Sequence, residues 1–131
     1  MGRGLEAYGA LVLRIFLGVI YMAHAYLALF VMGPAKTIDY QRALHIPLPE
    51  IGAWYLILAH GLGGLMLILG IMVRWAALAN IPIIAGALWF VHLPQGFFIF
   101  GGKNGYEYVL FLLGATVAQA LLGAGAFTLK K

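Results

Sequence analysis

Three of the four histidines in this 131-residue chain lie inside long apolar stretches. His24, His60 and His92 fall in the first, second and third stretch, and Glu107 begins the fourth. At a rise of about 1.5 Å per residue, their positions place all three imidazoles in the same half of a membrane. Polar side chains in a membrane span are costly and commonly functional, and an imidazole, with an ordinary pKa of about 6.5, exchanges protons near neutral pH.

These residues predict a quinone site in the outer half of the membrane. The quinone head group is expected to be surrounded by His24, His60, Trp89 and His92. Neutral imidazoles would form hydrogen bonds with its carbonyls. Glu107 at the outer mouth would pass protons to water. A flat apolar ring among aromatic side chains suits the rest of such a pocket. No residue is assigned a catalytic role.

Several of these residues also have a structural interpretation. A histidine in a membrane commonly forms a hydrogen bond between helices, and His92 with Trp89 also suits an anchor in the headgroup region. Arg14, in the first stretch, either extends to the cytoplasmic headgroups or pairs inside the bundle. Asn80 and Gln119 are expected to hydrogen-bond between helices.

A metal or haem site is disfavoured. Three histidines and a carboxylate have the ligand types for zinc, copper or iron, and two facing histidines can hold a haem. However, no two of them have the i, i+4 spacing of a helical metal motif. The chain contains no cysteine, which excludes disulfides, iron–sulfur clusters and Cys-ligated zinc.

The composition identifies the elements that must carry these residues. Hydrophobic residues make up 64% of the chain and charged residues 9%, and the mean hydropathy is +0.99. A soluble domain has about 45–50% hydrophobic and about 25% charged residues, so a water-soluble domain is excluded. Disorder is excluded as well, because so apolar a chain does not remain unfolded in water. The net charge of +4 includes no basic run, so no nucleic-acid partner is expected. The lipid bilayer is the expected environment.

Four apolar stretches are long enough to cross a bilayer, and they predict transmembrane helices at residues 8–32, 51–72, 75–95 and 106–129. Between them lie an external loop at residues 33–50, a tight turn at Val73-Arg74 and a glycine-rich segment. We expect one all-α transmembrane domain over residues 1–131, folded as an integral membrane four-helix antiparallel bundle. Ala23-His24-Ala25 imitates a signal-peptide cleavage site, but the apolar run continues past it, so the first helix is expected to be retained.

The basic residues near the helix ends predict the orientation. With four spans, the side that contains both termini holds Arg3, Arg74, Lys130 and Lys131, and the opposite side holds Lys36, Arg42 and Lys103. The positive-inside rule therefore predicts a multi-pass protein of the cell membrane with both termini in the cytoplasm.

The spacing within the helices suggests how the polar groups converge. Arg14, Gly18, Tyr21 and His24 recur at intervals of four, three and three residues, so they share one helical face. In the second helix, His60 precedes three glycines in four residues, which allow a neighbouring backbone to approach closely. His60 is therefore expected to face the interior of the bundle.

Three segments of the chain resemble those of one family. They are LRIFLG at residues 13–18 followed by His24, GGLMLILG at 63–70 followed by RWAA at 74–77, and HLPQGFF at 92–98 leading to GYEY at 105–108. Together they resemble the DoxX family of small four-helix membrane proteins, with the spacing between the helices preserved. Four of the candidate residues fall on positions that match the family pattern: Arg14, His24, His92 and Glu107.

The resemblance implies a function in quinone-linked redox chemistry. The family takes its name from a subunit associated with thiosulfate:quinone oxidoreduction, and other relatives are linked to resistance against quinones, catechols or oxidative stress. On this basis Arg14 joins the predicted quinone-binding residues. The sequence departs from the family pattern twice: Ala25 and Ala28 stand where a Gly and a Lys are frequent, and His60-Gly61-Leu62 precedes Gly63 where a Glu is frequent.

Two functions follow from these observations. The first is a membrane subunit of a quinone-linked oxidoreductase, which receives electrons from other membrane or peripheral redox subunits or from a reductant that meets the quinone directly. The alternative is a non-catalytic membrane anchor or assembly subunit of a larger complex, with residues 33–50 as its best external surface. A homo-oligomer is compatible with both. A carrier is the weakest hypothesis, because no inverted repeat is visible.

Overall fold

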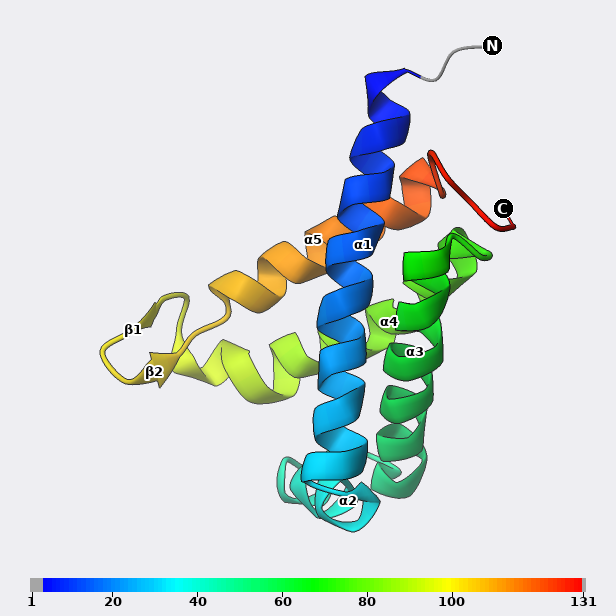
Figure 1. Cartoon of the computed structure of the whole chain (residues 1–131). Coiled ribbons are helices and arrows are strands. Elements are labelled where there is room, and N and C mark those ends of the chain that lie inside the picture. The colour runs from blue at the N-terminus through cyan, green and yellow to red at the C-terminus, as the bar shows by residue number, and fades with distance from the viewer. Residues whose placement is uncertain (1–3, 131) are drawn as a thin grey trace.

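The computed structural model describes residues 4–130 (Figure 1). In this range it has five α-helices: α1 (Leu5–Tyr26), α2 (Pro34–Ala43), α3 (Pro49–Leu69), α4 (Val73–Ala87) and α5 (Glu107–Leu122). Three short helical turns extend α1 and α4: the π-helical turns η1 (Leu27–Val31) and η2 (Leu88–His92), and the 3-10 turn η3 (Leu93–Gln95). Strand β1 (Ile99–Phe100) pairs antiparallel with β2 (Lys103–Asn104).

Three segments among the described residues are long and apolar enough to cross a membrane: Leu5–Val31, Pro49–Leu69 and Val73–Gln95. The fourth apolar helix, α5, is shorter. Its 16 residues extend about 24 Å, less than the roughly 30 Å of a bilayer core. The helical, membrane-type architecture expected from the sequence is therefore present.

The predicted count of four helices is not met over residues 4–130, because the expected loop at residues 33–50 contains α2. Pro34 begins this helix, where its missing N–H group needs no partner. The Thr37 hydroxyl donates hydrogen bonds to the carbonyls of Ala28 and Gly33, both at 2.9 Å. These bonds fix α2 against the end of the first span.

Two boundaries differ from the prediction because of left-handed backbone. The turn expected at Val73-Arg74 lies earlier, since Gly70 and Met72 have φ values of 74° and 45° and α4 begins at Val73. The last helix ends at Leu122 rather than near residue 129. Gly123, with φ of 81°, follows it and takes this conformation at little cost.

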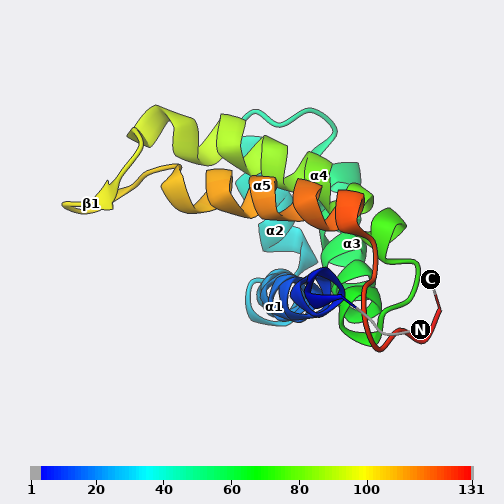
Figure 2. The same cartoon turned by 90° about the horizontal axis from the view of Figure 1, so that it is seen from above.

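The helices form two crossed pairs rather than one antiparallel bundle. α1 packs along α3, α4 packs along α5, and the second pair runs across the first (Figures 1 and 2). Glycines bring α1 and α3 together: a Cβ atom added to Gly18 would lie 2.7 Å from the Gly64 carbonyl oxygen, and one added to Gly64 would lie 2.9 Å from the Gly18 oxygen. The interface of α1 with α5 is shorter than its interface with α3, so α1 runs along α3 rather than along α5.

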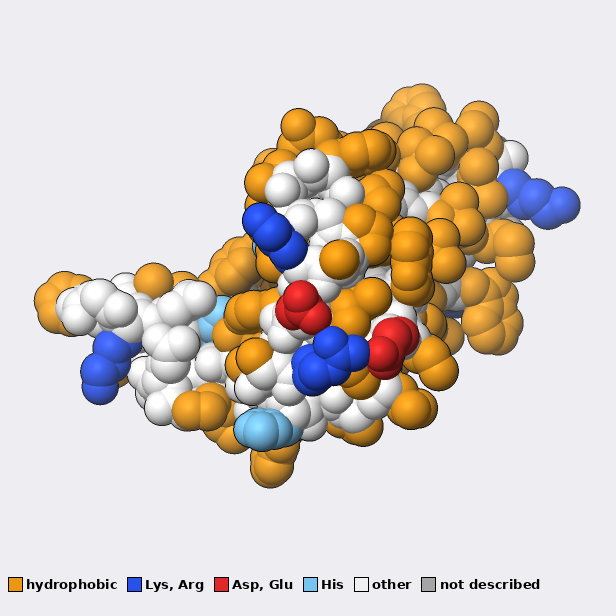
Figure 3. Space-filling model, turned by 90° about the horizontal axis from the view of Figure 1, so that it is seen from below, with side chains coloured by type: hydrophobic (Ala, Val, Ile, Leu, Met, Phe, Trp, Pro, Cys, Tyr) orange, Lys and Arg blue, Asp and Glu red, His pale blue; other side chains and the backbone are white. Residues whose placement is uncertain are grey.

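The start of α1, the α3–α4 turn and the end of the described chain lie together. The Met72 amide donates to the Lys130 carbonyl at 2.8 Å, and the Ala126 amide donates to the Ala7 carbonyl at 3.0 Å. Charged side chains gather at the other end, on and beside α2 (Figure 3), where Arg42 pairs with Asp39 and Glu50. Arg3 and Lys131, which enter the orientation argument, lie outside the described residues.

Candidate functional site

A buried polar cluster lies where four helices meet. It consists of Tyr21 from α1, His60 from α3, Asn80 from α4 and Thr116 from α5, each no more than 4% exposed. The rings of Tyr21 and His60 are stacked, with centroids 4.7 Å apart and planes inclined by 12°. The Thr116 hydroxyl donates to the carbonyl of Leu112 at 2.7 Å, so the Tyr21 hydroxyl donates to Thr116.

The hydrogen bonds of Asn80 determine which nitrogen of His60 carries a proton. The amide nitrogen of Asn80 donates to the carbonyls of Ala59 at 3.0 Å and Ala76 at 2.9 Å. This places Oδ1 towards His60 Nδ1, at 2.6 Å. Because an amide oxygen only accepts, Nδ1 of His60 must donate, and Nε2 of the neutral ring is left with a lone pair.

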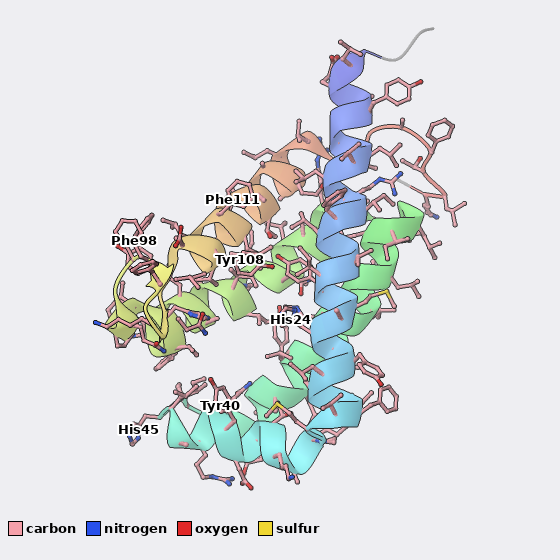
Figure 4. The ribbon with its side chains drawn as sticks, turned by 60° about the vertical axis from the view of Figure 1, so that its left-hand side comes forward. His24, Tyr40, His45, Phe98, Tyr108 and Phe111 are labelled. Carbon is pink, nitrogen blue, oxygen red and sulfur yellow. The ribbon has the colours of Figure 1, made fainter. Side chains whose placement is uncertain are left out.

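His24 lies beside this cluster, on the exposed side of α1 (Figure 4). Its ring meets that of His60 edge to face, with centroids 6.2 Å apart. Nδ1 of His24 is 2.9 Å from the Ile20 carbonyl oxygen and so donates to it, which again leaves Nε2 as an acceptor. No hydrogen bond to Nε2 of either ring is found over residues 4–130. Two imidazoles from different helices thus lie in contact, and each keeps an acceptor nitrogen.

Arg14 does not belong to this cluster. Its side chain is fully buried and donates to five backbone carbonyls, those of Leu67, Ile68, Ala124, Ala126 and Phe127, at 2.6–2.9 Å. These bonds use all five guanidinium N–H donors. The carbonyls at the end of α3 also favour a positive charge through the helix dipole. Arg14 therefore binds the chain's own C-terminal segment.

His92 and Glu107 hold the β-hairpin. Nδ1 of His92 donates to the Asn104 carbonyl at 2.9 Å, and the Glu107 carboxylate accepts from the Ile99 amide at 2.7 Å. Gln95 adds a third bond by accepting from the Asn104 amide at 2.8 Å. Trp89 is 67% exposed. The structure thus brings His24 and His60 together and gives His92 and Glu107 local roles at the hairpin.

Three members of the cluster, Tyr21, Asn80 and Thr116, were not among the predicted site residues. Tyr21 carried a signal, since it shares the helical face of His24 three residues away. Asn80 was expected to bond between helices, and its bond to Ala59 of α3 does so. Gln119 likewise donates to Ala10 of α1 at 3.3 Å. Thr116 carried no signal, because a threonine in an apolar run commonly bonds its own helix, as it also does here.

The arrangement suits hydrogen bonding and proton transfer. In the described part of the chain, no group of three or more His, Asp or Glu side chains is placed to hold a metal ion. An apolar pocket of about 730 Å³ between α1 and α5 reaches Ile20, one helical turn from His24. The pocket lining thus ends on α1 at Ile20, one helical turn before His24.

Comparison with known proteins gives one match. The profile of the DoxX family matches residues 9–93, more than half of the chain. No curated protein and no solved structure matches. The matched region contains the whole of α3 and α4 and most of α1, and therefore includes His24, His60 and Asn80.

Proposed function

Because the chain belongs to the DoxX family, we propose that this membrane protein is a subunit of a quinone-linked oxidoreductase that binds the quinone head group beside His24 and His60. The observation that supports the proposal is the pair of imidazoles with their Nδ1 protons already bonded. Each neutral ring therefore keeps Nε2 as an acceptor that a ligand hydroxyl could use. Residues other than these two hold the rings in place.

The hydrogen-bond network favours the reduced form of such a ligand. A quinone and its quinol interconvert by exchange of two electrons and two protons. Neutral His24 and His60 accept hydrogen bonds at Nε2, so they fit the hydroxyl groups of a quinol, whereas quinone carbonyls require the protonated rings. The sequence predicted neutral imidazoles bonded to the quinone carbonyls, and the proposal here is that they bond to the quinol hydroxyls. His24, on the exposed side, would accept a proton and release it, while Tyr21 and Asn80 hold His60.

The test is the quinone content of the purified protein. The protein is prepared gently in native lipid and extracted with organic solvent, and quinone and quinol are quantified by mass spectrometry. We expect near-stoichiometric content in the wild type and a loss to the level of bulk lipid in His24→Ala. His24 is exposed, so its replacement should leave the fold intact. His45→Asn is the matched control, because His45 is exposed near α2 and asparagine tolerates its φ of 63°. Equal content in all three proteins, at the level of bulk lipid, would reject this site.

The hairpin supports a second candidate, an anchor or assembly subunit. Phe98 and Phe100 are 68% and 83% exposed, and β1 and β2 project beyond the helices (Figure 1). Exposed aromatic side chains on a projecting element suit a contact with another subunit or with the membrane interface. If this is the role, Phe98→Ser with Phe100→Ser should release co-purified subunits while the quinone content stays unchanged.

We also propose that both chain ends lie on the cytoplasmic side. The support is that the start of α1, the α3–α4 turn and the end of the described chain are hydrogen-bonded to one another. Two of the basic residues that favour this side, Arg74 and Lys130, lie at that end.

A further inference from the structure

The pocket between α1 and α5 is an elongated apolar groove. Its α1 wall includes Gly9, Leu13, Phe16 and Ile20, which repeat along one helical face. Its α5 wall includes Tyr108, Phe111 and Ala115. From Gly9 to Ile20 the wall extends about 16 Å along the helix. Glu6 is the charged residue in the lining, and it lies at the end away from His24.

One end of this groove lies at Ile20, one helical turn before His24 of the candidate site. His24 follows Ile20 by one helical turn on the same face of α1 and donates to its carbonyl. Tyr108 lies at the start of α5 and lines the groove together with Phe111. A molecule with a polar head at His24 could therefore continue into the groove without leaving the protein surface.

We infer that the groove binds the polyprenyl or alkyl tail of the quinol whose head group lies at His24 and His60. This inference rests on the proposed function. His24 at the head end has an Nε2 that can accept a hydrogen bond from a hydroxyl group, and no Lys or Arg lines the groove to hold a phosphate. The remaining lining is almost entirely apolar and includes the exposed rings of Phe16 and Phe111, which suit a hydrocarbon chain.

The far end of the groove lies beside a second pocket of about 540 Å³. The two pockets share Glu6, Ala10 and Leu122, and the second also contains Arg74 and Trp75. A tail longer than the groove can thus continue past Leu122. The same geometry defines the main competitor, a phospholipid with its phosphate at Arg74 and one acyl chain in the groove.

The experiment compares a quinol that carries a decyl tail with the same quinol without a tail. Affinity is measured on full-length protein in lipid nanodiscs and corrected for partitioning of each quinol into empty nanodiscs. We expect the tail to raise the affinity of the wild type by about tenfold, a modest factor because a tail that leaves lipid gains packing contacts but little hydrophobic transfer energy. Ala115→Trp, which fills the groove, should remove this advantage and leave the tailless quinol bound as before.

Val117→Trp is the matched control, since Val117 is an exposed residue of the same helix outside the groove. It should behave as the wild type. A second measurement uses the wild type alone, with a photoreactive group at the end of the tail. Cross-links should map to the α1 and α5 residues that line the groove. This measurement remains informative if Ala115→Trp fails to fold.

The outcomes separate the two proposals. If neither quinol binds to the wild type, the proposed function is rejected and this inference with it. If the tailless quinol binds but the tail adds nothing, or if the Ala115→Trp protein keeps the tail's advantage, the groove does not hold the tail although the head-group site stands. Cross-links outside α1 and α5 would also overturn the inference. So would a co-purified phospholipid that is lost in Arg74→Gln and is not displaced by the tailed quinol.

Discussion

At the scale of single residues, the polar groups in the core form a directed hydrogen-bond network. Asn80 donates twice to carbonyls, accepts from His60, and so selects one tautomer of that ring. Tyr21 stacks on His60 and donates to Thr116. Each group thus limits the orientation of the next, and Nε2 of the neutral His60 ring remains an acceptor. If the proposed site exists, this tautomer favours hydroxyl ligands over carbonyl ligands.

Replacement of Asn80 should release this tautomer. In the wild type at a pH where His60 is neutral, ¹⁵N NMR of labelled imidazoles should report a proton on Nδ1. In Asn80→Leu we expect a mixture of both tautomers and a free energy of unfolding lower by about 1–3 kcal/mol, because a buried donor and two buried acceptors lose their partner. Asn80→Asp, whose carboxylate still accepts from Nδ1, should keep the tautomer. A wild-type proton on Nε2 would contradict the network described here.

At the scale of elements, glycine decides which helices pack most closely. Gly18 and Gly64 face each other, and a Cβ atom on Gly18 would also lie 2.6 Å from Ile68 Cγ1. The close approach of α1 and α3 gives these helices their long common interface, while α5 meets α1 over a shorter length and leaves the groove. The crossed arrangement thus produces both the polar cluster and the apolar pocket.

Substitution of these glycines tests the helix contact. Gly18→Ala should lower the free energy of unfolding by about 1–3 kcal/mol, because the added methyl group overlaps the backbone of α3. Gly114→Ala is the matched control, since a Cβ atom at Gly114 meets nothing within 4 Å. It should be neutral or stabilise by about 0.5–1 kcal/mol through the higher helix propensity of alanine. Reversible unfolding in mixed detergent measures both, and equal effects at the two sites would argue against close packing at Gly18.

At the scale of the whole molecule, Arg14 joins parts of the chain that are far apart in sequence. It donates to the end of α3 and to the segment that follows α5. The segment in turn pairs with the α3–α4 turn through Lys130. One buried side chain therefore holds the end of the chain against α1 and α3.

Arg14→Lys should accordingly weaken the whole fold. A lysine retains the charge but has three donors where five are used, so buried carbonyls lose their partners. We expect the free energy of unfolding to fall by about 3–5 kcal/mol, and the C-terminal segment to become sensitive to protease. Arg74→Lys, at an exposed residue with one hydrogen bond of 3.4 Å, should stay within about 0.5 kcal/mol of the wild type. A protease-resistant C-terminus in Arg14→Lys would show that other contacts hold it.

The topology can be measured directly, because the chain contains no cysteine. Single cysteine substitutions of Lys130 and Arg74 should react with a thiol reagent added on the cytoplasmic side. Single cysteine substitutions of Lys36 and Lys103 should react with the reagent added on the opposite side. This pattern requires that α5 crosses the membrane although its 16 residues are few for a span. Labelling of Lys130 and Lys103 from the same side would mean that α5 does not cross.

Composition and residue spacing alone indicated a membrane protein and the approximate positions of its apolar helices, and three sequence segments carried the resemblance to the DoxX family that the family profile confirmed. This was possible because long apolar runs require lipid and their lengths are set by the bilayer. The inward position of His60 also followed from its neighbouring glycines. These features are local, so each can be read from a window of the sequence.

Only the tertiary structure decided which polar residues meet. Arg14 and His24 lie on one face of one helix, yet Arg14 binds the C-terminal segment and His24 contacts His60. His92, expected beside them, holds the hairpin instead. The helix crossing and the turns at Gly70 and Gly123 set these outcomes, and they depend on contacts between distant segments. Periodicity gives the face of a helix, but it does not specify which neighbour covers that face.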